Sequence, residues 1–96
     1  MSLEKNRTIN KARKQLDSLD NKLLNIIKIR TRLVNQILQK KTNKKQIVDK
    51  VRIKKILKNI KKKSLKKKID VKLTKTIWMS MIKAYIDFEY RKFKKK

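Results

Sequence analysis

Apolar residues recur at every third or fourth position through the first part of the chain, which is the spacing of one face of an α-helix. The pattern predicts one amphipathic helix over about residues 5–41, far longer than the average globular helix of about 11–12 residues. A polar run at residues 42–45 ends this helix. The apolar positions are Ile9, Ala12, Leu16, Leu19, Leu23, Ile26, Ile27, Leu33, Val34, Ile37 and Leu38.

Two more helical patterns follow in the second half of the chain. The first predicts a helix over about residues 47–62, with apolar positions Val48, Val51, Ile56, Leu57 and Ile60, and a polar run at 61–64 ends it. The second predicts a helix over about residues 70–93, for which Asp70 is a suitable N-cap. Its apolar positions are Leu73, Ile77, Trp78, Met81, Ile82, Tyr85, Ile86 and Phe93. No segment alternates with a period of two, so we expect an all-α fold in a single domain of residues 1–96.

The length of the first helix has a consequence for assembly. A helix of about 35 residues spans about 50 Å, and two shorter helices of the same chain cannot easily cover its whole apolar stripe. A second copy of the chain would cover it, so we expect an intertwined helical homodimer. A free-standing coiled coil is the alternative, although the stripe is wider than a strict heptad seam.

Composition then excludes many kinds of protein. The 96 residues include no Gly, Pro, Cys or His. This removes disulfides, thiolate nucleophiles, the commonest general base and the commonest metal ligands, and it removes glycine-rich phosphate loops. We therefore expect no metal and no cofactor. No apolar run approaches the roughly 18 residues of a membrane span, and the N-terminus lacks the apolar block of a signal peptide, so a cytoplasmic location is expected.

The charge is extreme, with 32 Lys and Arg against 7 Asp and Glu and a formal net charge of +25. The hydrophobic content of 39% is too high for a disordered basic tail. A folded domain with such a surface could meet nucleic acid, an anionic membrane or a small polyanion. Most of the basic residues are Lys, which compositional drift could also explain, so the few arginines are more informative.

The informative charges are those on faces that should be apolar. Arg30 interrupts the stripe of the first helix, and Arg13 shares a row with Lys41. Arg52 lies beside core positions of the second helix, and Glu89 follows the apolar positions of the third. A buried guanidinium needs an anion, either a carboxylate of the chain or a bound molecule.

Two interpretations of these charges remain open. They could form ordinary internal ion pairs, with carboxylates supplied by Asp20, Asp49 or Glu89. Taken as a set, however, the basic residues outnumber the available carboxylates, which favours an external di- or tricarboxylate. Arg13 and Lys41 lie about 42 Å apart along a straight helix, so they could meet one small molecule only if they came from the two chains of an antiparallel dimer.

The same residues resemble the all-helical chorismate mutases of the AroQ type. The resemblance covers about residues 3–93, including the stretch 19–24 and the third helix around Trp78. Its motif residues are Arg13, Asp20, Leu23, Leu24, Arg30, Lys41, Asp49 and Arg52.

This resemblance implies an intertwined homodimer and the rearrangement of chorismate to prephenate, an isomerase step of aromatic amino acid biosynthesis in the shikimate pathway that needs no cofactor or metal. Arg13 from the neighbouring subunit and Arg30 would clamp the substrate carboxylates, where bidentate geometry favours Arg. Arg52 would help to hold a carboxylate or the charge network. Lys41 would donate a hydrogen bond to the ether oxygen, and Asp49 would lie at the hydroxyl end of the substrate.

Three positions depart from the family pattern. Ile53 stands where a Glu often binds the substrate hydroxyl, so that contact is lost, and Tyr85 replaces a small polar residue. Glu89 stands where bacterial members commonly have a Gln that donates to the ether oxygen. Some fungal members also carry a Glu at this position. A Glu can donate only when it is protonated. Burial favours the acid, whereas Lys41 and the nearby arginines favour the carboxylate.

The alternatives to a mutase come from three directions. The same fold hosts isochorismate-pyruvate lyases with a similar basic pocket. A mutase relative could have lost its activity through Ile53 and Glu89. A basic helical nucleic-acid-binding protein could use the lysine runs at 61–63, 66–68 and 94–96, although aromatic residues make up only 5% and no known reading module is visible.

Overall fold

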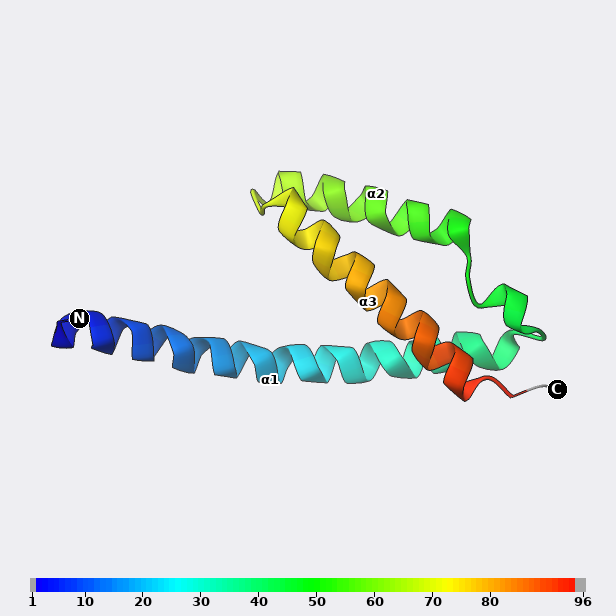
Figure 1. Ribbon diagram of the computed structural model, residues 1–96, viewed down its shortest axis with the longest axis horizontal. Coiled ribbons are helices and arrows are strands. Elements are labelled where there is room, and N and C mark those ends of the chain that lie inside the picture. The colour runs from blue at the N-terminus through cyan, green and yellow to red at the C-terminus, as the bar shows by residue number, and fades with distance from the viewer. Residues whose placement is uncertain (1, 95–96) are drawn as a thin grey trace. The chain divides into compact units, whose positions relative to one another are not determined.

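The computed structural model describes residues 2–94, and helices dominate them (Figure 1). The elements are α1 at Leu3–Lys40, a short 3₁₀ helix η1 at Lys44–Gln46, α2 at Lys50–Lys66 and α3 at Val71–Lys92. No strand occurs in this part of the chain. The prediction of an all-α fold with a long, a short and a long helix is therefore confirmed.

The chain divides into two compact units, which are described separately. The first ends at Leu33 and contains the N-terminal part of α1. The second begins at Val34 and contains the end of α1, η1, α2 and α3. The expectation of a single domain over residues 1–96 stays a prediction.

The first unit is helical but buries little. Its backbone meets the requirements of a long helix because no Gly or Pro interrupts it, and Glu4 in the first turn complements the positive end of the helix dipole. The apolar stripe that the sequence predicts is exposed in the single chain. More than half of the side-chain surface is accessible at Leu16, Leu19, Leu23 and Ile26.

The connection from α1 to α2 is held by local polar contacts and two buried side chains. Asn43 and Gln46 form a capping box around η1, an element that the sequence analysis did not anticipate. Leu38 and Ile47, at 4% and 3% exposure, are the buried apolar side chains among residues 2–94. Asp49 then caps the N-terminus of α2 by accepting a hydrogen bond from the backbone N–H of Arg52.

The second helix differs from the expected bounds at both ends. It begins at Lys50 rather than near residue 47, because η1 occupies the chain before it and Asp49 serves as its N-cap. It ends at Lys66 rather than near residue 62, because lysine is a good helix former and does not stop a helix. The stop is made by Lys68, whose φ of 58° is left-handed. The N–H groups of Lys68 and Ile69 bond the carbonyls of Leu65 and Ser64, which is a Schellman motif.

α2 and α3 pack against each other as a helical hairpin (Figure 1). Asp70 is the N-cap of α3 and accepts a hydrogen bond from the N–H of Leu73, which confirms that prediction. Near the turn, the buried hydroxyls of Ser64 and Thr74 lie 2.7 Å apart and join the two helices by a hydrogen bond. The end of α3 at Lys92 is close to the expected boundary near residue 93.

Candidate active site

The centre of the candidate site is an ion pair between the end of α1 and the last turns of α3. Lys41 Nζ donates a hydrogen bond to Glu89 Oε1 at 2.8 Å. The side chains are only 17% and 10% exposed, respectively. The two residues are far apart in sequence, yet both were selected as charges on faces that should be apolar. The structure brings them together.

The helices place these two groups for local reasons. Lys41 is the first residue after α1, and its N–H still bonds the carbonyl of Leu38, so the helix end fixes the start of its side chain. Glu89 lies three residues before the end of α3, and its carbonyl accepts the N–H of the C-cap Phe93. Tyr85 lies one turn before Glu89 and is half-buried. Its ring makes an edge-to-face contact with the ring of Phe88, with the two ring centroids 6.3 Å apart.

The start of α2 carries three more of the predicted site residues. Asp49 accepts the N–H of Arg52 at 2.9 Å, so one carboxylate oxygen already serves as the helix cap. Both side chains are exposed, whereas Ile53 is half-buried. Ile53 offers no polar atom where the family pattern often has a carboxylate.

The two remaining predicted residues lie in the first unit. Arg13 is exposed and Arg30 is half-buried on α1. The other six predicted residues, Lys41, Asp49, Arg52, Ile53, Tyr85 and Glu89, all lie in the second unit.

The expectation that Arg13 and Arg52 lie in the apolar interior of a dimer stays a prediction. Both are exposed in the single chain. The reason is that the apolar stripe of α1 is itself exposed, so one chain forms no interior around Arg13. Among the described residues, Glu89 pairs with Lys41.

Sequence reasoning missed the hydroxyl pair of Ser64 and Thr74. The available signal was position, because Ser64 continues the apolar row of Leu57 and Ile60 on α2 and therefore points into the hairpin. The capping box of Asn43 and Gln46 was also readable, as a polar cap residue followed three positions later by Gln.

The structure also bears on membranes and metals. Within residues 2–94, no helix has both the length and the apolar character that crossing a membrane would require. The same residues contain no cluster of three or more His, Cys, Asp or Glu side chains that could hold a metal ion.

Comparison with known proteins assigns the family. Searches of curated proteins and of solved structures gave no significant match. The family model for chorismate mutase type II matches residues 12–90. This range includes α2, nearly all of α3, most of α1 and all eight predicted site residues. The chain therefore belongs to the chorismate mutase type II family, the helical isomerases that rearrange chorismate to prephenate.

Proposed function

We propose that this chain rearranges chorismate to prephenate at a basic site that two copies of the chain share. The observation that carries the proposal is the Lys41–Glu89 pair, two polar groups that face each other in a largely buried position. It lies within the range that the family model matches.

The reaction suits what this sequence can supply. In the rearrangement an ether C–O bond breaks and a C–C bond forms within one molecule, and no nucleophile or redox partner takes part. The sequence has no His or Cys to provide one. The protein's tasks are to hold the substrate in its folded reactive conformer and to stabilise the negative charge that develops on the ether oxygen.

Lys41 and Glu89 are proposed to donate hydrogen bonds to the ether oxygen of the substrate. The Lys41 ammonium donates one hydrogen bond to it, in place of its bond to Glu89. Glu89 donates a second bond, for which it must first take up a proton. In the structure Glu89 Oε1 accepts a hydrogen bond from Lys41 Nζ.

The arginines are proposed to hold the two carboxylates. Arg30 and Arg13 each present a planar fork that matches a carboxylate bidentately, and Arg13 comes from the neighbouring subunit. Arg52, which is exposed beside the start of α2, contributes to the same positive field. Asp49 would lie at the hydroxyl end of the substrate, and Ile53 and Tyr85 would lie beside the substrate without replacing the missing acidic contact.

The exposed stripe of α1 supports the proposed homodimer. Its large apolar side chains are 42% to 60% exposed, at Leu16, Leu19, Leu23, Ile26, Ile27, Leu33 and Ile37. Burying half of such a side chain contributes about 1 kcal/mol, so these seven contribute about 7 kcal/mol per chain, or about 14 kcal/mol per dimer. Association costs about 4–15 kcal/mol, so burial of the stripes on both chains can support a dimer.

The test of activity is direct. Purified protein should convert chorismate to prephenate, followed by the loss of chorismate absorbance at several pH values. If Glu89 donates as an acid, the rate rises as the pH falls, and Glu89→Gln flattens that profile. An unchanged profile removes Glu89 from the mechanism. Lys41→Met should abolish turnover, whereas Lys40→Met, an exposed neighbour on the same chain, should keep it.

Subunit complementation tests the shared site. Arg13→Ala and Arg30→Ala should each be inactive alone, with Arg32→Ala as the matched active control. After the two inactive variants are unfolded together and refolded, half of the dimers are mixed, and one of the two sites in each mixed dimer is intact. About a quarter of the wild-type activity should return. No recovery, or a monomer by light scattering at micromolar concentration, refutes the shared site.

The same assays separate the alternatives. Release of pyruvate from isochorismate would indicate a lyase, and no turnover of either compound would indicate an inactive relative. DNA affinity that falls steeply with salt would indicate a nucleic-acid-binding protein. A cytoplasmic location and a place in aromatic amino acid biosynthesis stay predictions.

A further inference from the structure

A pocket lies between α2 and α3. Its volume is about 460 Å³, and none of the predicted site residues lines it. The apolar side chains in its wall are Leu57, Ile60 and Val71, all half-buried. The polar side chains that complete it are Lys54, Lys58, Lys61, Lys75 and Thr74.

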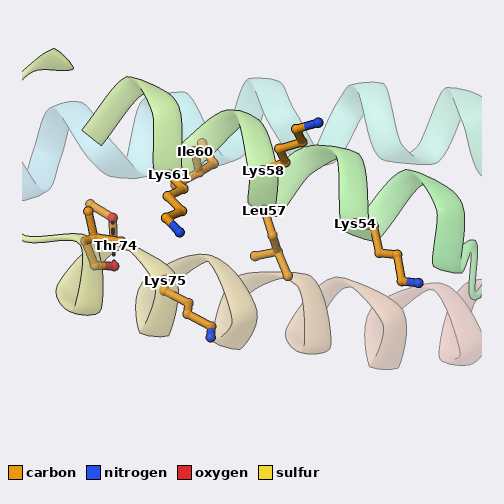
Figure 2. Close-up of a pocket in the computed structure, with 8 residues that line it drawn as sticks. Lys54, Leu57, Lys58, Ile60, Lys61, Thr74 and Lys75 are labelled. Carbon is orange, nitrogen blue, oxygen red and sulfur yellow. Dashed lines mark hydrogen bonds between the residues drawn. The ribbon is translucent and has the colours of Figure 1, made fainter. Parts of the chain in front are cut away.

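The two kinds of side chain have different places in this pocket. Figure 2 shows Leu57 extending from α2 toward α3, with Lys54 and Lys61 on either side of it along α2. Thr74 is already engaged, because its hydroxyl bonds Ser64 and lies close to the carbonyls of Asp70 and Val71. The side chains left to contact a ligand are therefore the three apolar ones, called here the apolar floor, and the four lysines, called the lysine rim.

The charge around this pocket has one sign. No Asp or Glu lines it, and the 17 residues of α2 include no acidic residue at all. The rim lysines are exposed, so their ammonium groups are free to move toward a bound anion. The lysine ammonium groups repel one another, and the apolar side chains beside them are partly exposed to water. An anion with an apolar part would reduce the repulsion and cover the apolar side chains.

None of the eight residues assigned to the reaction lines the pocket, and the pocket lysines lie on a different flank of α2 from Arg52. Lys54 and Lys61 are seven residues apart, which places them on one flank of the helix. Arg52 and Ile56, four residues apart, lie on the other flank. A ligand held by Lys54 and Lys61 would therefore lie away from Arg52.

We propose that this pocket is a separate binding site for a small organic anion. The apolar body of the ligand lies against Leu57, Ile60 and Val71, and its carboxylate, sulfonate or phosphate group meets the lysines. The volume is in the range of small-molecule sites, about 300–1,000 Å³. Lysine suits this role because it acts as a mobile point charge that tolerates different anionic groups. The inference is independent of the proposed mutase activity.

The experiment uses naphthalene-2-sulfonate as the probe and the full chain as the protein. Titration followed by ¹H–¹⁵N NMR should shift the backbone signals of Leu57, Lys61, Val71 and Thr74 in a saturable manner. Neutral 2-naphthylmethanol and inorganic sulfate, which each carry one half of the chemistry, should bind at least fivefold more weakly. Equal binding of either control, or shifts confined to α1, overturns the proposal.

A matched pair of double variants completes the test. Lys54→Gln/Lys61→Gln should weaken binding at least fivefold. Lys55→Gln/Lys62→Gln, which removes the same charge from neighbouring positions that do not line the pocket, should change it less than twofold. Equal weakening by both pairs shows that only the overall charge matters and refutes the site. Chorismate turnover should be the same in both pairs, so that failure here is distinguishable from failure of the mutase proposal.

Discussion

Substitution of Lys41 or Glu89 breaks their ion pair, and the structure allows its effect on the free energy of unfolding to be worked out. Lys41 Nζ and Glu89 Oε1 lie 2.8 Å apart, and both side chains are largely shielded from water. Each charge is therefore compensated mainly by its partner and not by solvent. Lys41→Met keeps most of the aliphatic stem but leaves the Glu89 carboxylate without its ammonium partner. Glu89→Gln keeps an oxygen that can still accept from Lys41, but it removes the negative charge.

The size of the effect follows from competing terms. At 2.8 Å two unit charges attract by about 6 kcal/mol when the effective dielectric constant is about 20. Desolvation of both groups offsets most of this, so the net coupling should be about 1–3 kcal/mol. We expect Lys41→Met to lower the free energy of unfolding by about 2–4 kcal/mol and Glu89→Gln by about 1–2 kcal/mol.

The assay is a double-mutant cycle measured by urea unfolding. All four proteins are compared at one fixed concentration, because subunit association adds to apparent stability. The double variant should lose less stability than the sum of the single variants, by the coupling energy. Lys40→Met is the control and should change stability by less than about 0.5 kcal/mol. If the two single effects add within about 0.5 kcal/mol, the pair is not a stabilising contact and the reasoning is refuted.

Three further predictions concern the α2–α3 hairpin, and urea unfolding measures each. Lys68→Gly should raise stability by about 0.5–1 kcal/mol, because glycine adopts the left-handed φ of 58° without steric cost; a loss would contradict the Schellman assignment. Asp70→Ala should cost about 1 kcal/mol through the lost cap of α3, whereas Asp70→Asn should cost little. Ser64→Ala should cost about 1–2 kcal/mol, and its effect should shrink in a Thr74→Val background; equal effects in both would show that the hydroxyls do not interact.

Local patterns in the sequence were sufficient to predict the helices. The three-and-four spacing of apolar residues predicted α1 and α3 closely, and Asp70 predicted the start of α3, because a cap is a contact between residues three positions apart. The end of α2 was not predictable in the same way. Lysine continues a helix readily, and Lys68 adopts a conformation for which its residue type gives no signal.

The sequence singled out Lys41 and Glu89 as informative charges, and the structure pairs them. Lys41 was selected because it shares a row with Arg13, and Glu89 because it follows the apolar positions of the third helix. Their pairing depends on how the chain turns through η1 and how α3 returns to the end of α1, which no local pattern encodes. The resemblance to chorismate mutases was likewise readable from spacing, and the family match over residues 12–90 confirms it.

What the sequence determined by itself is therefore the class of fold and the family. Helix periodicity and capping depend on residues three or four positions apart, so each segment of the sequence shows them without reference to the rest of the chain. Only the tertiary structure decided that Glu89 takes Lys41 as its partner, that Ser64 meets Thr74, and that the α2–α3 hairpin carries a lysine-rimmed pocket. These contacts join residues distant in sequence, and their energies depend on burial that arises only when the helices pack.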